Sequence, residues 1–337
     1  MRLLRPLRRP GAALLAAIAL AGSLAACGAA PGATSSPSTP AQTPAGSLPG
    51  GICANAPVPG ELPDWAPPTA APEILLVPVS SQQVCGPNRF MFSFLDTTNR
   101  PIAAPDRTAS VAFFNLGRDP ERSVAIATGT FIWAIEDSRG VYVVNVDFTE
   151  AGLWGAEFTT AAGGSSSTIR FTFDVRVEGS TPAIGDPAPA SRTPTLADVG
   201  GDVALLSTDP EPVARFHETS VDAALAAGDP FVLVFATPKF CTSAQCGPTL
   251  DRMKPVATEF PDLTVIVVEP YELEFRDGSL NAVRDAGGQL TPVPSVIEWG
   301  LVSEPWIFVV DGDGIVTASF EGIVSKDELR ATVQALR

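Results

Sequence analysis

The stretch FVLVFATPKFCTSAQCGPTLDRMKPVATEF, residues 231–260, joins a run of apolar, β-forming residues to a helical pattern. Cys241 and Cys246 lie at the junction, so the sequence predicts a strand that delivers two cysteines to the start of a helix. A cysteine in the first turn of a helix meets the positive end of the helix dipole, which favours its thiolate form. This junction therefore indicates a site with thiol chemistry.

Around this stretch the pattern alternates between helices and strands. We expect helices over 220–227, 247–260, 279–286 and 326–336, and strands over 231–236, 263–269, 306–310 and 315–320. Ser325 and Glu328 form a capping box for the last helix, and residues 311–314, Asp-Gly-Asp-Gly, indicate a hairpin turn. Such alternation predicts an α/β sheet with helices on both faces.

The order of these elements, the cysteines at the strand-to-helix junction and a proline just before a late strand resemble the thioredoxin fold over about residues 187–337. In that family a cis-proline faces the redox pair, and Pro305 occupies the matching place. The tetrapeptide Cys246-Gly247-Pro248-Thr249 is similar to the family's Cys-Gly-Pro-Cys, while Phe240-Cys241 is a competing match to the start of that motif. Four residues separate the two cysteines here, where the family has two.

The resemblance implies thiol-disulfide exchange through the Cys241/Cys246 pair, with Pro305 completing the catalytic set. We expect Cys246 to be the nucleophile and Cys241 to be the resolving cysteine, and the reverse assignment stays open. The strand over 231–235 lacks the buried carboxylate that assists proton transfer in the family. The alternative is a non-catalytic envelope binding protein in which Cys241 and Cys246 form a structural disulfide.

Three neighbours of the cysteines in the predicted fold are candidates to modulate the pair. Lys239 is a cation that would lower the pKa of a nearby thiol, and Glu304 is a carboxylate that would raise it or accept a proton. Trp306, which follows Pro305, is the third candidate.

Residues 72–178 show a different pattern, with short β-rich runs separated by turn residues and no helical period. We expect strands over 74–79, 90–95, 110–116, 141–148 and 169–177. We expect Trp133 and Trp154 to be core-filling residues. The predicted fold class is an N-terminal all-β immunoglobulin-like sandwich, residues 51–178, plus a C-terminal α/β thioredoxin-like domain, residues 196–337, joined by a linker over 179–195.

The N-terminus combines four arginines with an apolar stretch that is too short for an ordinary membrane span. It ends in Leu24-Ala25-Ala26-Cys27, which resembles the lipobox of bacterial lipoproteins, where the cysteine is lipidated. We therefore expect a signal peptide over 1–26, lipidation of Cys27 and a disordered Pro/Ser/Ala linker over 27–50. The protein would then be extracytoplasmic and anchored to the bacterial membrane by lipid.

Removing the four arginines of residues 1–26 from the 22 basic residues leaves 18 against 37 acidic ones, a formal charge of −19. A charge of this sign makes nucleic acid an unsuitable partner. The expected partners are protein thiols or disulfides of the cell envelope, and the membrane through the lipid on Cys27. No cofactor or metal is expected.

Five cysteines less Cys27 leave four, which suits two disulfides in an oxidising compartment. We favour the pair Cys241–Cys246 because these residues are near neighbours in the chain, which leaves Cys53 with Cys85. Free thiols at these last two positions stay open.

Overall fold

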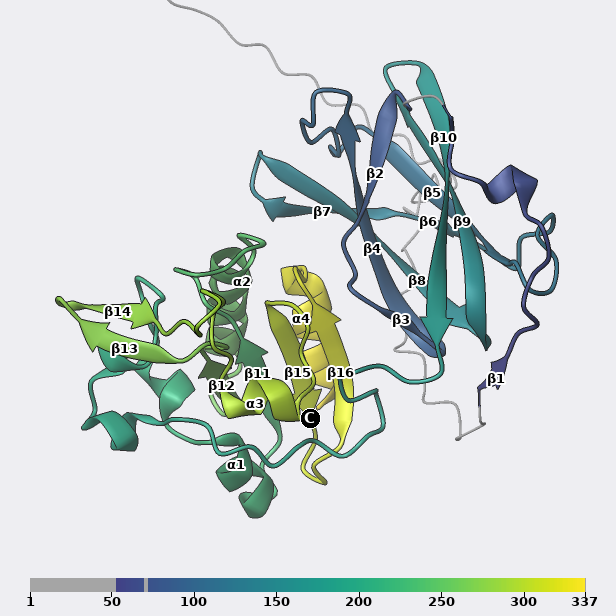
Figure 1. Cartoon of the computed structure of the whole chain (residues 1–337). Coiled ribbons are helices and arrows are strands. Elements are labelled where there is room, and N and C mark those ends of the chain that lie inside the picture. Colours follow the sequence, from purple (N-terminus) through teal and green to yellow (C-terminus); the bar gives the residue numbers. More distant parts are fainter. Residues whose placement is uncertain (1–52, 70–71, 337) are drawn as a thin grey trace, which may run out of the picture. The chain divides into compact units, whose positions relative to one another are not determined.

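The computed structural model describes residues 53–69 and 72–336. The predicted signal peptide, the lipidation site Cys27 and the linker over 27–50 lie outside the described residues. Of the structure, 39% is strand and 18% is helix, so it is mostly β-sheet. The strands form several separate sheets (Figure 1).

Two sheets are built from residues 54–176. The first has the order β3-β10-β9-β5-β6, with β1 beside β9; these strands are Gln83–Val84, Ser165–Arg176, Glu150–Ala162, Thr108–Asn115, Ala125–Thr128 and Ala54–Asn55. The second has the order β2-β4-β8-β7; these strands are Ile74–Pro78, Gly86–Asp96, Arg139–Phe148 and Thr130–Ile135.

The two sheets share one hydrophobic core. Phe90, Phe92 and Phe94 alternate along β4 and cluster with Phe113 and Phe158 of the other sheet. Period-two alternation of this kind places these three side chains on one face of the strand. Trp154 belongs to the same cluster and is 1% exposed, which confirms its predicted role as a core residue. Trp133 is half-buried, with its ring 4.9 Å from that of Phe131.

The first described residues, 53–66, run along the outside of the first sheet, and we call them the N-terminal arm. The arm contains β1 and the short 3-10 helix η1, Pro63–Trp65. Trp65 packs edge-on against Phe114, with ring centroids 5.0 Å apart, and donates a hydrogen bond to the carbonyl of Pro120. Residue 155 is glycine because the ring of Trp65 fills the space that a Cβ would take.

Residues 231–321 supply the third sheet, with the order β12-β11-β15-β16; these strands are Thr264–Val268, Phe231–Phe235, Trp306–Val310 and Val316–Glu321. β11 and β12 are parallel and are joined through helix α2, Cys246–Glu259, while β15 and β16 run antiparallel to their neighbours. The other helices are α1, Val221–Ala227; α3, Pro294–Glu298; α4, Lys326–Ala335; and the 3-10 turns η2, Leu196–Val199, η3, Val203–Leu205, and η4, Ala214–His217.

Each face of this sheet has its own core. On one face, side chains of α2 and α4 pack with Val232 and Val234 of β11. On the other face, residues of α1 and the Trp299 side chain pack with Phe231, Leu233 and Phe235. All five residues of β11 are fully buried, so this strand runs through the middle of the structure that holds the cysteines.

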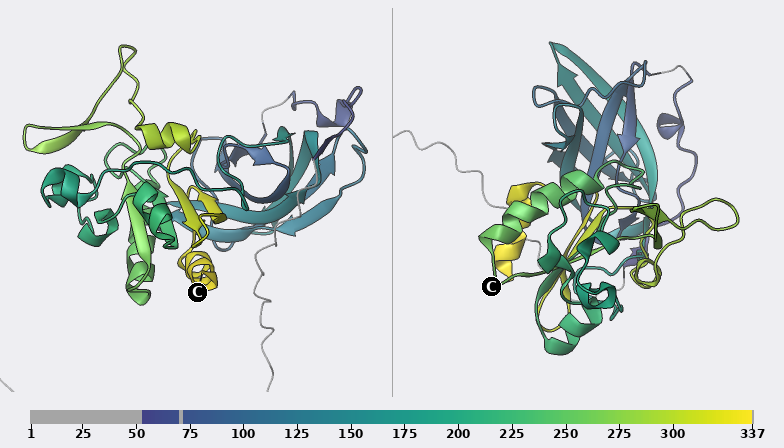
Figure 2. Two further views of the ribbon diagram at one scale, coloured as in Figure 1. Left: turned by 90° about the horizontal axis from the view of Figure 1, so that it is seen from below. Right: turned by 90° about the vertical axis from the view of Figure 1, so that its left-hand side faces the viewer.

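The predicted helix over 279–286 is wrong. Residues Ser279–Ala282 form strand β14, which pairs with β13, Leu273–Arg276, in a hairpin that extends away from the third sheet (Figure 2). Asp277 and Gly278 link the two strands with φ values of 52° and 77°. Positive φ at both central residues is the signature of a two-residue hairpin turn, and Asp-Gly is a favoured sequence for it.

The predicted fold class is therefore corrected. An α/β thioredoxin-like domain was expected, but the structure is mostly β-sheet distributed over several sheets. In the third sheet only the β11–β12 pair is parallel, and the region predicted as a further helix is a separate two-stranded sheet. The alternation of helix and strand inferred from the sequence was too regular because it missed this hairpin.

Two local predictions in this region are confirmed. Ser325 accepts a hydrogen bond from the backbone N–H of Glu328, and the Glu328 side chain accepts one from the N–H of Ser325. This reciprocal pair is the capping box that starts α4. At residues 311–314 the backbone turns back, with the N–H of Gly314 donating to the carbonyl of Asp311.

Candidate functional site

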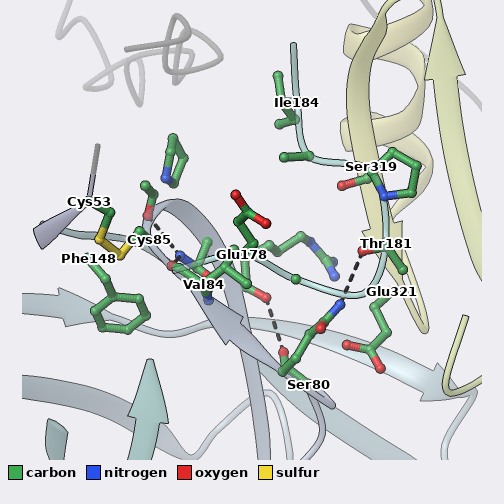
Figure 3. A pocket seen from close by; sticks show the side chains of 18 of the residues that line it. Cys53, Ser80, Val84, Cys85, Phe148, Glu178, Thr181, Ile184, Ser319 and Glu321 are labelled. Carbon is green, nitrogen blue, oxygen red and sulfur yellow. Dashed lines mark hydrogen bonds between the residues drawn. A yellow bond between two sulfur atoms is a disulfide. The ribbon is translucent and has the colours of Figure 1, made fainter. Parts of the chain in front are cut away.

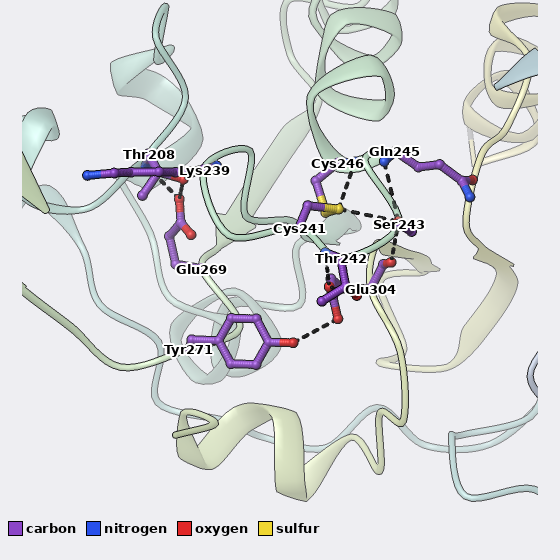
Figure 4. Close-up of a disulfide and its surroundings, with 10 residues drawn as sticks. All are labelled: Thr208, Lys239, Cys241, Thr242, Ser243, Gln245, Cys246, Glu269, Tyr271 and Glu304. Carbon is purple, nitrogen blue, oxygen red and sulfur yellow. Dashed lines mark hydrogen bonds between the residues drawn. A yellow bond between two sulfur atoms is a disulfide. The ribbon is translucent and has the colours of Figure 1, made fainter. Parts of the chain in front are cut away.

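The Cys241/Cys246 disulfide lies where the chain passes from β11 to α2 (Figure 4). The two Cα atoms are 6.1 Å apart, and Cys246 is the first residue of the helix. The predicted pairing of these cysteines is therefore confirmed. Cys246 is 0% exposed and belongs to the core beneath α2, whereas Cys241 is only partly buried. The two sulfurs of the bridge thus differ in their access to solvent.

The sulfur of Cys241 has two polar neighbours. The backbone N–H of Cys246 donates to it over 3.3 Å, and the hydroxyl oxygen of Ser243 lies 3.3 Å away. The Ser243 hydroxyl also donates to the backbone carbonyl of Glu304 at 3.0 Å and accepts from the N–H of Gln245 at 3.3 Å. The loop between the cysteines therefore carries a side-chain hydroxyl directly beside the more accessible sulfur.

The carboxylate of Glu304 holds the same loop from the opposite side. Its Oε1 accepts hydrogen bonds from the N–H and the hydroxyl of Thr242, both at 3.0 Å, and its Oε2 accepts one from the hydroxyl of Tyr271 at 2.8 Å. Glu304 is 9% exposed. Burial, together with the hydrogen bond to Glu304, raises the pKa of Tyr271, so its phenol stays a donor. The loop and Glu304 form one connected network (Figure 4).

The structure brings Cys241, Cys246 and Glu304 together but not the other two candidate modulators. The ammonium group of Lys239 donates to the carbonyl of Leu280, in the β13–β14 hairpin. Trp306 belongs to the core on the other face of the sheet from Cys246, and its indole N–H donates to the hydroxyl of Ser303. Neither side chain makes a described hydrogen bond to a cysteine.

Pro305 follows Glu304 directly, and the peptide bond between these residues is cis. Its carbonyl accepts a hydrogen bond from the N–H of Gly322 at 2.8 Å. Pro305 is buried, and it lies next in the chain to the residue whose carbonyl and carboxylate both contact the cysteine loop. Its catalytic role stays a prediction.

A buried carboxylate that the sequence did not indicate lies just after β12. Glu269 is 7% exposed, and its Oε1 accepts hydrogen bonds from the N–H and hydroxyl of Thr208 at 2.6 and 2.7 Å. Burial raises the pKa of Glu269, and its contacts with Thr237 and Thr208 offset part of that rise. Thr208 in turn accepts a hydrogen bond from the N–H of Lys239, two residues before Cys241.

Cys53 and Cys85 form the second disulfide, with Cα atoms 6.2 Å apart, as predicted. The bridge borders a pocket of about 640 Å³ whose lining also includes Phe148, Thr181 and Glu321 (Figure 3). The side chain of Asn88 stabilises the nearby turn. It accepts a hydrogen bond from the N–H of Val84 and donates one to the carbonyl of Val84. The bridge joins the N-terminal arm to the turn between β3 and β4.

Neither a candidate metal site nor a candidate membrane-spanning helix occurs among the described residues. Residues 53–69 and 72–336 contain no group of three or more His, Cys, Asp or Glu side chains placed to hold a metal ion. Within the same residues, no helix combines the length and the apolar character that crossing a membrane requires.

Sequence reasoning missed Thr242, Ser243, Tyr271 and Glu269. The first two could have been suspected, because any polar residue in a four-residue loop between bonded cysteines lies close to the sulfurs. Tyr271 and Glu269 left no such signal, since their partners are distant in the chain: Tyr271 bonds a residue 33 positions away and Glu269 one 61 positions away.

No protein-family model matches the chain, and no curated protein matches it either. Three solved structures show weak likeness to about a third of it. A DUF4426 family protein from Pseudomonas aeruginosa PAO1 has 10% identity and a TM-score of 0.22, covering 32% of this chain and 91% of its own. The Lin-41 filamin domain has 15% identity and a TM-score of 0.21, covering 32% and 97%.

A third solved structure, MtrC from Shewanella baltica OS185, has 11% identity and a TM-score of 0.23, covering 31% of this chain and 22% of its own. TM-scores this low support no conclusion about fold or function.

Proposed function

We propose that the Cys241/Cys246 pair carries out thiol-disulfide exchange with protein thiols or disulfides outside the cytoplasm. The observation that carries this proposal is the unequal exposure of the two bonded sulfurs, with Cys246 fully buried and Cys241 partly exposed. Exchange begins when a thiolate attacks one sulfur of a disulfide, and access decides which sulfur takes part. Cys241 is then the cysteine that meets the substrate, the reverse of the assignment that the helix position favoured.

With the protein in its reduced form, the Cys241 thiolate attacks a substrate disulfide. A mixed disulfide forms between Cys241 and one substrate sulfur, and the other substrate sulfur leaves as a thiolate. The Cys246 thiolate then attacks the Cys241 sulfur, which closes the internal disulfide and releases the second substrate thiolate. The two protons given up by the cysteines end on the substrate thiols, and two electrons pass from protein to substrate. The reverse sequence oxidises a substrate dithiol.

The polar surroundings of Cys241 support this role. Its sulfur receives the N–H of Cys246 at the first residue of a 14-residue helix, where the helix dipole favours negative charge. A donor at this position stabilises Cys241 as a thiolate, both when it attacks a substrate disulfide and when it leaves the mixed disulfide in the reverse sequence. Glu304 and Tyr271 fix the loop on its other side through Thr242.

Trapping experiments test the proposal. In Cys246→Ser the mixed disulfide cannot be resolved, so we expect a covalent complex with a model disulfide protein such as insulin, visible on non-reducing gels. Cys241→Ser should form none, and neither variant should reduce insulin catalytically. The matched control is the double variant Cys53→Ser/Cys85→Ser, which leaves the Cys241/Cys246 pair intact and should retain the activity.

A structural disulfide in a non-catalytic binding protein would give the opposite results. The unsubstituted protein would then not reduce insulin, and the Cys246→Ser variant would form no covalent complex with it. Its Cys241/Cys246 bridge would also have a reduction potential below about −300 mV, in the range of structural disulfides.

The proposal includes attachment to the membrane through lipid on Cys27. The support is the sequence Leu24-Ala25-Ala26-Cys27 after an apolar stretch, which resembles a lipobox. A single acyl chain binds a membrane only weakly, whereas several acyl chains on Cys27 would anchor the protein firmly. In the native host the protein should partition into the detergent phase of a Triton X-114 extract, and Cys27→Ala should move it to the aqueous phase. Aqueous partitioning of the unsubstituted protein would contradict the anchor.

A further inference from the structure

The hydroxyl group of Ser243 has one proton and two acceptors within reach. The backbone carbonyl oxygen of Glu304 is 3.0 Å away, and the sulfur of Cys241 is 3.3 Å away. The N–H of Gln245 donates to the same hydroxyl oxygen. This N–H therefore does not compete with the hydroxyl for either acceptor. A serine hydroxyl donates one hydrogen bond at a time, and these two contacts are therefore alternatives.

The redox state of the pair decides which acceptor is stronger. A sulfur in a disulfide is neutral and a weak acceptor. In the oxidised protein the Ser243 hydroxyl therefore donates its hydrogen bond to the Glu304 carbonyl. A thiolate carries a full negative charge, and hydrogen bonds to charged acceptors are about twice as strong as those to neutral ones. Reduction that leaves Cys241 as a thiolate reverses the preference.

We propose that Ser243 is a catalytic residue whose hydroxyl turns from the Glu304 carbonyl to the Cys241 sulfur when the disulfide opens. This inference rests on the proposed function, because it concerns the thiolate that exchange requires. The hydroxyl adds a second donor to the N–H of Cys246. It stabilises Cys241 as the attacking thiolate and, in the reverse sequence, as the thiolate that leaves when the second substrate thiolate attacks the substrate sulfur of the mixed disulfide.

The surrounding contacts allow this switch without movement of the backbone. Thr242, the preceding residue, is held at its N–H and hydroxyl by the Glu304 carboxylate. Gln245, two residues later, is bonded to the Ser243 oxygen itself. Only rotation of the O–H bond about the Cβ–Oγ axis is needed to move the proton between the two acceptors.

The test measures the ionisation of Cys241 directly. In full-length protein carrying Cys246→Ala, Cys241 has no disulfide partner, and its alkylation by iodoacetamide can be followed across pH at the Cys241 peptide by mass spectrometry. Adding Ser243→Ala should move the midpoint of the pH–rate profile upward by about one pH unit, because a hydrogen bond to the thiolate is lost. At pH values below both midpoints, the alkylation rate should fall about tenfold.

Two further variants separate the hydroxyl from the general shape of the loop. Ser243→Thr keeps a hydroxyl and should restore the lower midpoint. Thr242→Val is the matched control, since it removes a neighbouring hydroxyl that contacts Glu304 and makes no described contact with sulfur. Circular dichroism of each variant shows whether the fold is kept.

An unchanged midpoint in a folded Ser243→Ala variant would overturn the assignment, as would an equal shift in Thr242→Val. The two proposals can fail separately. If the unsubstituted protein lacks exchange activity, the proposed function is wrong, while the pH midpoint still decides whether Ser243 donates to the Cys241 thiolate.

Discussion

His217 is the one histidine of the chain, and it is 3% exposed at the end of η4. Burial lowers the pKa of its imidazole to about 4, and the negative charge of Asp209 offsets part of that effect. The side chain is therefore neutral in the folded protein throughout the physiological range. The unfolded chain, whose histidine titrates near 6.5, binds a proton before the folded chain does.

This difference predicts a loss of stability in acid. His217 costs no stability above pH 6.5, and the loss of stability grows as the pH falls, reaching about 3 kcal/mol near pH 4. Urea denaturation at a series of pH values measures the slope, and His217→Gln should flatten it. The single imidazole also gives a single NMR titration, and a midpoint near 6.5 in the folded protein would contradict the prediction.

Ionisation of Glu269 gives a pH dependence of stability opposite to that of His217. Because burial raises its pKa in the folded state, the folded protein binds a proton more readily than the unfolded chain, and stability falls as the pH rises above about 4.5. Glu269→Gln removes the buried charge and keeps an oxygen that can accept from Thr208. We expect a higher midpoint of urea denaturation at pH 8 and little change at pH 4.

Glu272→Gln is the control for Glu269→Gln, since Glu272 is exposed. Its denaturation midpoint should not change at either pH. Equal stabilisation by both substitutions would mean that the effect comes from the net charge of the protein and not from burial of Glu269.

At the scale of elements, the start of α4 is held by a short local motif. Ser325→Ala removes the acceptor for the N–H of Glu328 and should reduce the free energy of unfolding by about 1 kcal/mol. Ser325→Asp keeps an acceptor at the N-cap and should restore most of the loss. Thermal denaturation measures both variants, and equal destabilisation by alanine and aspartate would contradict the capping role.

Elements with strong local patterns were predicted with nearly correct bounds. The run Trp306–Val310 is apolar throughout and became β15 at those same residues, because a strand buried on both faces needs no polar alternation. The capping box likewise marked the first residue of α4. The segment 279–286 failed because it is short and its period is ambiguous, and the Asp277-Gly278 turn before it was overlooked.

The candidate site, too, could be predicted from the sequence only in part. Cys241 and Cys246 could be paired from the sequence because they are only 5 positions apart in the chain. The contact between Thr242 and Glu304 spans 62 positions, and no local pattern can indicate it. Burial of Cys246 also depends on the packing of α2 against β11, so the access of each sulfur could not be read from residue order.

At the scale of the whole molecule, the two disulfides close loops of different length. Cys53 and Cys85 are 32 positions apart, and Cys241 and Cys246 are 5 apart. A longer closed loop removes more conformational entropy from the unfolded chain. The Cys53–Cys85 bridge is therefore expected to contribute more to stability, although the other bridge lies at the proposed active site.

Substitution of each pair by serine tests this expectation. Cys53→Ser/Cys85→Ser should lower the free energy of unfolding by about 3–4 kcal/mol, and Cys241→Ser/Cys246→Ser by about 2 kcal/mol. Guanidinium denaturation compares the two. A larger loss from the second pair would show that native packing around the buried Cys246, and not loop closure, dominates.

The Cys53–Cys85 bridge also determines how a pulling force enters the molecule. Tension applied to the chain before residue 53 would pass through the two sulfurs to Cys85, next to the start of β4, a strand hydrogen-bonded on both sides. The rest of the N-terminal arm, with β1 and Trp65, follows Cys53 in the chain and would carry little of that load. Reduction of this one bond would redirect the strain into the arm, which would then peel from its sheet before the core yields.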